Sequence, residues 1–120
     1  MNILIVDDSA AMRMMVLRTL RQSGFDSKSV KQAEDGADAL EKIRADQPDL
    51  VIADWNMPNM TGIELLRTLR EEGNKVDFGF LTTESTTKMR QTATEAGAKF
   101  LVSKPFTAEA FEKVLALLNG

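Results

Sequence analysis

The chain has 120 residues, enough for one domain with a sizeable core and too few for a second. Its longest apolar runs fall far short of the roughly 18 residues of a membrane span, and no basic n-region precedes Asp7, so we expect a cytoplasmic protein without membrane insertion. A net charge of −3 without a basic stripe argues against direct nucleic-acid binding, and the lack of Cys and His excludes disulfides, thiolate sites and His-based catalysis.

The first half of the chain alternates strand and helix patterns. Residues 2–6 are apolar and predict a strand, and Ser9 is a suitable N-cap for the helix that follows. Gly24 is expected to end that helix. Residues 27–33 predict a weaker strand, which we place at a sheet edge, and the next helix is expected to end before Gln47-Pro48.

The second half repeats the same alternation. The run Leu50 to Asp54 predicts a strand buried on both faces, and residues 76–81 and 100–102 predict two more. Three helices are expected to begin at hydroxyl caps: Thr61 within a capping box, Ser85, and Thr107, whose helix carries Phe111, Val114, Leu115 and Leu118 on one face.

The pattern is therefore a βα unit repeated five times with short connections. Such alternation is typical of an α/β protein with a parallel sheet and helices on both faces. We predict a single doubly wound (βα)5 domain over residues 1–120. At this size and with right-handed crossovers, the expected strand order is 2-1-3-4-5, the flavodoxin-like arrangement.

Asp54 ends the most apolar of the predicted strands, and Met57-Pro58 prevents that strand from continuing. Open α/β sheets bind their ligands at the carboxyl ends of strands, so an acid placed there suits a nucleophile or a metal ligand. Taken alone, Asp54 is equally well explained as a loop residue that caps the next helix.

Polar residues also follow the other predicted strands. Asp7 and Asp8 follow the first, Thr82 ends the fourth and Lys104 follows the fifth. In the order 2-1-3-4-5 the first and third strands are neighbours, so these two acids and Asp54 converge. A hard divalent cation such as Mg²⁺ would offset three carboxylates, while Lys104 and Thr82 could meet phosphoryl oxygens.

Each of these residues has a simpler explanation. Asp7 or Asp8 could stabilise the positive end of the first helix, Lys104 could be a structural counter-ion, and Thr82 an ordinary strand residue. Matched chemistry at four strand ends is harder to explain by packing, and we favour the functional interpretation.

Together, Asp7-Asp8, Asp54, Thr82 and Lys104-Pro105 resemble the receiver domain of two-component response regulators over essentially the whole chain. The run from Asp54 to Met60 is particularly similar to the stand-alone chemotaxis regulators of that family. The combined motif is highly specific, although each part would be weak by itself.

The resemblance implies that Asp54 accepts phosphate from a phosphohistidine on a partner histidine kinase. It also implies that Mg²⁺ is bound by Asp8, Asp54 and the backbone carbonyl of Asn56, with Asp7 assisting through water. Lys104 would contact the phosphoryl group.

The same resemblance implies a signalling protein rather than a conventional enzyme, catalysing only its own phosphorylation and slow dephosphorylation. Thr82 would move toward the phosphate, and the Lys104-Pro105 bond would be cis. We expect a monomer that signals by conformational change to a downstream protein, with the flagellar motor switch as a candidate target.

The chain departs from the family at Leu101, where many receivers carry Tyr or Phe as a rotating partner of the threonine. Phe100 precedes it and is expected on the opposite side of the strand. Phosphate chemistry is unaffected, but the usual aromatic switch is not expected to operate.

Two other functions fit part of the pattern. A Mg²⁺-dependent phosphohydrolase with an aspartyl nucleophile usually has a second Asp two residues after the first, where this chain has Asn56, which cannot shuttle protons. An interaction module that no longer takes phosphate would not need the full set of acids. We therefore expect the receiver function.

Overall fold

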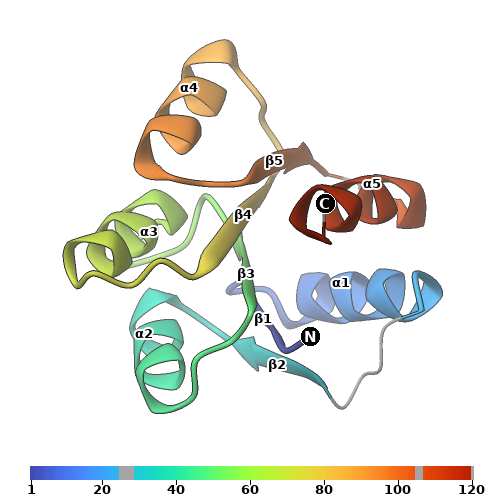
Figure 1. Cartoon of the computed structure of the whole chain (residues 1–120), viewed down its shortest axis with the longest axis horizontal. Helices are drawn as coiled ribbons and strands as arrows, with labels where there is room; N and C mark the ends of the chain where they lie inside the picture. Colours follow the sequence, from blue (N-terminus) through green and yellow to red (C-terminus); the bar gives the residue numbers. More distant parts are fainter. Residues whose placement is uncertain (25–28, 105–106, 120) are drawn as a thin grey trace.

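Five parallel strands form one open sheet in the computed structural model of the chain (Figure 1). Their order is β2-β1-β3-β4-β5, which confirms the predicted fold class. The strands are β1 Ile3–Val6, β2 Val30–Ala33, β3 Leu50–Asp54, β4 Asp77–Thr82 and β5 Phe100–Ser103. Strands β1 and β3 pair directly, with Ile3 opposite Leu50 and Val6 opposite Ala53. Their carboxyl ends therefore lie side by side.

The five helices divide between the two faces of the sheet. They are α1 Ala10–Gln22, α2 Gly36–Ala45, α3 Gly62–Glu71, α4 Thr87–Ala96 and α5 Ala108–Asn119. Figure 1 shows α1 and α5 on one face and α2, α3 and α4 on the other. The structure describes residues 1–24, 29–104 and 107–119, without the side chains of residues 115 and 117–119. The predictions for the Lys104-Pro105 bond, Leu115 and Leu118 lie outside this part.

The core consists of two layers of apolar side chains, one on each face of the sheet. Period-two alternation along the strands sends neighbouring residues to opposite layers. Leu101 packs in the layer beneath α2, α3 and α4, whereas Phe100 packs against the layer beneath α1 and α5. The predicted opposition of these two side chains is confirmed. No helix in the described residues is long and apolar enough to cross a membrane.

Helix caps agree with the predictions at three helices and differ at a fourth. Ser9 caps α1, and Thr61 forms a full capping box with Glu64 at the start of α3. The Thr107 hydroxyl accepts a hydrogen bond from the Ala110 N–H at the start of α5. The prediction of Ser85 as the cap of α4 is wrong, because Thr86 has the extended backbone of an N-cap and its hydroxyl accepts a hydrogen bond from Met89. The Ser85 hydroxyl is instead turned inward and buried.

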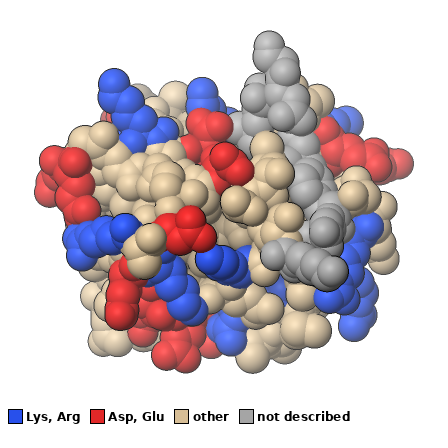
Figure 2. Space-filling view, turned by 60° about the horizontal axis from the view of Figure 1, so that its bottom comes forward, with Lys and Arg blue, Asp and Glu red and all other residues tan. Residues whose placement is uncertain are grey.

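Predicted strand boundaries were accurate to one residue except at the sheet edge. Strand β2 begins at Val30 rather than at residue 27, and residues 27–28 lie outside the described part. Within the described residues β2 pairs with β1 alone, so the edge position of β2 is as predicted. On the surface face obtained by turning the lower edge of Figure 1 forward, acidic and basic side chains interleave (Figure 2).

Candidate functional site

The polar residues singled out in the sequence meet at the carboxyl edge of the sheet. Asp7 follows β1, Asp54 is the last residue of β3, Thr82 is the last residue of β4, and Lys104 follows β5. Strands β1 and β3 are neighbours in the sheet, and the connections that leave them run to helices on opposite faces. A crevice formed in this way is the usual ligand site of an open α/β sheet.

Three carboxylates converge in this crevice. Asp7, Asp8 and Asp54 each place one oxygen within 4.8 Å of the others. Their environments differ, because Asp7 is buried, Asp54 is partly buried and Asp8 is exposed. The backbone N–H of Ser9 donates to Oδ1 of Asp7 at 2.9 Å, which fixes the buried acid while Asp8 faces solvent.

Lys104 follows the edge strand β5, and its side chain extends from there into the same crevice. Its Nζ lies 3.3 Å from Oδ2 of Asp7 and 3.3 Å from Oδ1 of Asp54. The Lys104 side chain is only 9% exposed, so this ammonium is held between the two acids in a poorly hydrated position. One ammonium does not balance three carboxylates, and the site retains an excess of negative charge.

The pKa of the Asp54 carboxyl is raised from its ordinary value. Burial is the largest cause, and the nearby Asp7 carboxylate acts in the same direction. Lys104 and the backbone N–H of Asn56 oppose the rise. Asp54 is therefore a desolvated carboxylate with a more basic oxygen than an exposed acid has, as suits a nucleophile.

The donor set fits a hard divalent cation. Carboxylate oxygens are the ligands that Mg²⁺ prefers, and the exposure of Asp8 leaves room for the water molecules that this ion keeps. Asn56 is exposed two residues beyond Asp54. The use of its backbone carbonyl as a further ligand stays a prediction.

Thr82 is fully buried at the end of β4. Its hydroxyl oxygen accepts a hydrogen bond from the Glu84 N–H at 3.2 Å, and its carbonyl oxygen accepts one from the Lys104 N–H at 2.7 Å. Thr82 thus joins the loop after β4 to the loop after β5. A change in the hydrogen-bond partner of the Thr82 hydroxyl would therefore affect both of these loops.

Gly62, which follows the Thr61 cap, is a part of the site that the sequence analysis did not identify. Its N–H donates to the Trp55 carbonyl at 2.8 Å. A Cβ at this position would clash with the carbonyl oxygen of Asp54 and lie 2.9 Å from the Phe80 ring. The start of α3 can approach the end of β3 this closely only with glycine. No sequence signal identified the neighbour that it touches.

Arg13 was also missed. It lies on α1, for which the sequence analysis predicted only the beginning and the end, and its guanidinium donates to the backbone carbonyl of Asp7 at 2.6 Å. An arginine on an amphipathic helix is ordinary, and only the fold shows that Arg13 is partly buried and which groups it contacts.

Comparison with known proteins supports one family. The chain matches the response regulator receiver domain over residues 3–116. It is 39% identical to the chemotaxis protein CheY of Pseudomonas aeruginosa over the whole of both chains. It is 38% identical to CheY-3 of Vibrio cholerae, over 96% of this chain and 88% of that protein.

Solved structures of the same family have the same fold. The structure of Vibrio cholerae CheY4 superposes with a TM-score of 0.84 at 37% identity, covering 96% of this chain and 95% of that one. The receiver domain of the Francisella response regulator 1452 has a TM-score of 0.87 at 25% identity, covering 98% and 96%.

Proposed function

The chain belongs to the response regulator receiver domain family, and on that basis we propose that it signals by accepting a phosphoryl group on Asp54. Receiver domains interact with histidine kinases and with downstream targets, and generally bind Mg²⁺ at an acidic pocket. The observation that carries the proposal is the position of Lys104, whose largely buried side chain places Nζ 3.3 Å from carboxylate oxygens of both Asp7 and Asp54. Phosphoryl transfer needs such a cation beside a carboxylate nucleophile.

The transfer is a substitution at phosphorus. A carboxylate oxygen of Asp54 attacks the phosphorus of a phosphohistidine on the kinase, and a P–O bond forms as the P–N bond breaks. The imidazole nitrogen keeps the electron pair of the broken bond and takes up a proton. Lys104 meets the negative charge on the phosphoryl oxygens, and the Thr82 hydroxyl donates to another of them.

Asp8, Asp54 and the Asn56 carbonyl would hold Mg²⁺, with Asp7 assisting through a water molecule. When bound, the ion offsets charge on the phosphoryl oxygens during transfer. The excess of carboxylates over ammonium groups at this site supports the assignment. Slow attack of water on the acyl phosphate then returns Asp54 to its free form.

Phosphorylation would change the partner of Thr82. In the present structure the Thr82 hydroxyl accepts from the Glu84 N–H, and a bond to a phosphoryl oxygen would draw it toward Asp54. The loop after β4 and helix α4 would shift with it. Leu101 lacks the ring that would fill the vacated space, so we propose that the switch depends mainly on Thr82 and this loop.

We further propose a role in chemotaxis. Two relatives that are 38–39% identical over nearly all of this chain are named chemotaxis proteins. The proposed partners are a sensor histidine kinase as phosphodonor and a component of the flagellar motor switch as target, both bound by a monomer.

The nucleophile is tested by labelling. The chain is incubated with a small acyl phosphate and Mg²⁺, and its intact mass is measured. We expect one labile phosphoryl group on the wild type and on Asp49→Asn, a control acid before β3 that accepts a hydrogen bond from the Asn2 N–H. Asp54→Asn should remain unlabelled. Undiminished labelling of Asp54→Asn, or continuous release of phosphate from simple phosphate esters, would contradict the proposal.

A further inference from the structure

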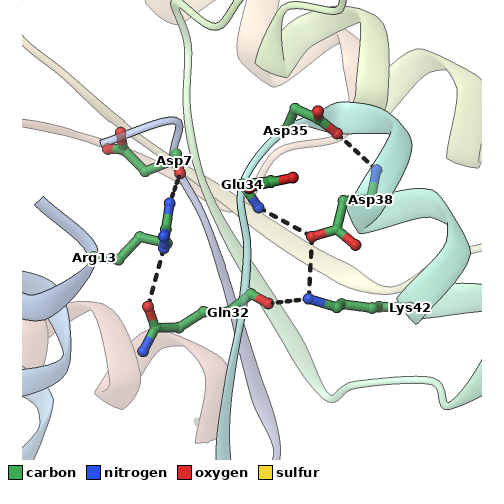
Figure 3. A network of polar contacts seen from close by, with 7 residues as sticks. All are labelled: Asp7, Arg13, Gln32, Glu34, Asp35, Asp38 and Lys42. Carbon is green, nitrogen blue, oxygen red and sulfur yellow. Dashed lines mark hydrogen bonds and ion pairs between the residues drawn. The ribbon is translucent and has the colours of Figure 1, made fainter. Parts of the chain in front are cut away.

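Arg13 joins the acidic crevice to the edge of the sheet. Its guanidinium donates through one nitrogen to the Asp7 carbonyl at 2.6 Å and through Nε to the Gln32 side-chain oxygen at 3.0 Å. In Figure 3, Arg13 approaches the carbonyl of Asp7 while the carboxylate of that residue extends the other way. Arg13 therefore holds the backbone of Asp7 and leaves its side chain available to the crevice.

The backbone at Asp7 needs such a partner. The Asp7 N–H still pairs with the Ala33 carbonyl at 3.2 Å, but β1 ends at Val6 and the chain turns out of the sheet. Asp7 is only 4% exposed. Without Arg13, its backbone carbonyl would therefore have no hydrogen bond and little access to water. A charged donor makes a stronger bond to that carbonyl than a neutral one.

The loop that Arg13 holds carries two of the three acids. Asp8 comes next in the chain, and among the described residues its carboxylate has no hydrogen-bond or ion-pair partner of its own. Its place within 4.8 Å of the other two carboxylates is therefore set by the backbone. Because Asp8 follows Asp7 in the chain, any motion of the Asp7 carbonyl group would also move the Asp8 carboxylate.

Arg13 is itself held on the opposite side. The backbone carbonyl of Gln32 accepts from Nζ of Lys42 at 2.6 Å, and Lys42 pairs with Asp38 of α2 at 3.0 Å. Oδ2 of Asp38 also accepts from the Glu34 N–H at 3.1 Å (Figure 3). The edge strand β2, which has a sheet partner on one side only, is thus fixed to α2 where Arg13 needs its anchor.

We propose that Arg13 is a positioning residue for the metal site. By holding the Asp7 carbonyl against Gln32, it keeps the loop after β1 in the arrangement that brings the Asp8 carboxylate to the cation. This inference depends on the proposed binding of Mg²⁺ in the acidic crevice. Groups behind the direct ligands commonly change metal affinity by about 10- to 100-fold when they are removed.

The first measurement is Mg²⁺ affinity, by calorimetry and by the emission of Trp55. We expect Arg13→Ala to raise the Kd about tenfold, and Gln32→Leu, which removes only the anchor, to raise it less. Arg13→Lys can restore one of the two hydrogen bonds and should recover part of the affinity. The matched control is Arg18→Ala, an exposed arginine of the same helix, which should bind like the wild type.

The second measurement needs no metal. In chelator, amide exchange of Ser9 reports the loop directly, because its N–H donates to Oδ1 of Asp7. We expect Arg13→Ala to accelerate exchange at Ser9 and to leave protected the Gly62 N–H at the start of α3, which donates to the Trp55 carbonyl. Equal acceleration at both sites would mean a purely structural role and would overturn the inference.

Failure of this inference is distinguishable from failure of the proposed function. If Asp8→Asn loses Mg²⁺ affinity while Arg13→Ala binds like the wild type, only the role of Arg13 is overturned. If Asp8→Asn binds like the wild type, or the wild type does not bind, the metal site itself is wrong and the role of Arg13 with it.

Discussion

The polar side chains at the two ends of the sheet differ in how fully they are paired. At the carboxyl end, Lys104 is shared between two carboxylates, and the Asp8 carboxylate has no partner in the described part of the chain. At the amino end, the side-chain amides of Gln47 and Asn74 bond to each other in both directions, at 2.8 and 2.9 Å. Each of these two amides donates one hydrogen bond to the oxygen of the other, and neither side chain carries a charge.

This difference distinguishes a site that can bind a cation, at the carboxyl end, from a pair of side chains that only stabilises the fold, at the amino end. Satisfied neutral pairs have little to gain from a ligand, whereas crowded carboxylates with one cation gain by binding another. Helix α3 runs between the two ends, because it starts beside Asp54 and its last turn lies near Asn74. Substitutions along the chain can therefore test each end with a matched partner at the other.

The largest effect on stability is expected within the carboxyl end itself. Leu101→Ala should lower the free energy of unfolding by about 3 kcal/mol, as truncations of buried leucines do. It should nevertheless keep the conformational response to phosphate. Thr82→Ala should cost less stability and lose that response. The measurement is amide exchange over residues 84–103, with and without a phosphate mimic. The reverse result would show that Leu101 carries the switch.

A smaller effect is expected from adding one methyl group at either end of α3. Gly62→Ala should cost about 2 kcal/mol or more, because the new Cβ meets backbone at Asp54 that cannot easily move. Gly73 has a φ of +80° but open space around its Cα, so Gly73→Ala should cost about 1 kcal/mol from backbone strain alone. Urea unfolding measures both. Only Gly62→Ala should also slow phosphorylation, and equal phosphorylation rates would show that the start of α3 does not position Asp54.

A change of opposite sign is expected when Asp54 loses its charge. Its pKa is raised in the folded chain, so the folded state binds this proton more tightly than the unfolded state does. The stabilisation from that proton is present in acid and is lost as the pH rises through the pKa of the folded state. With a chelator present to remove metal ions, the free energy of unfolding of Asp54→Asn should therefore exceed that of the wild type at pH 7. The difference between these two free energies should become smaller as the pH falls.

Asp46 provides the contrast at the exposed edge. A hydrogen bond from Lys31 lowers the pKa of the Asp46 carboxyl, so the contribution of Asp46 to folded-state stability is present at neutral pH and is lost in acid. Asp46→Asn should be no more stable than the wild type at pH 7. If Asp54→Asn and Asp46→Asn shift stability in the same direction at neutral pH, the two carboxylates are not in opposed environments.

The smallest effect is expected for the ion pair between Arg44 and Glu72. The Arg44 side chain is 56% exposed and that of Glu72 is 34% exposed, so screening by solvent and loss of side-chain entropy offset most of the attraction. Arg44→Ala should leave the urea midpoint, Mg²⁺ affinity and phosphorylation nearly unchanged. A clear loss of stability would mean that this ion pair contributes more than exposed pairs usually do, and a clear loss of Mg²⁺ affinity or phosphorylation would mean that it is coupled to the crevice.

Most of the fold followed from local patterns. Short apolar runs predicted four of the strands and a weaker pattern predicted β2, and the alternation with helices predicted the parallel sheet. The weakest element was β2, because an edge strand has few apolar side chains to signal it. The cap of α4 was misplaced by one residue, since Ser85 and Thr86 are both good caps and only packing decides which hydroxyl turns inward.

The sequence alone determined which chemistry the crevice holds, because an acid or a lysine at the end of a parallel strand must face the same edge of the sheet. Asp7, Asp8, Asp54, Thr82 and Lys104 could be identified in this way. Only the tertiary structure decided how they are held. The contacts of Arg13 with the Asp7 carbonyl and of Gly62 with Asp54 join elements whose approach depends on packing across the whole sheet. Backbone carbonyls carry no signature in a sequence, so no local pattern could reveal what binds them.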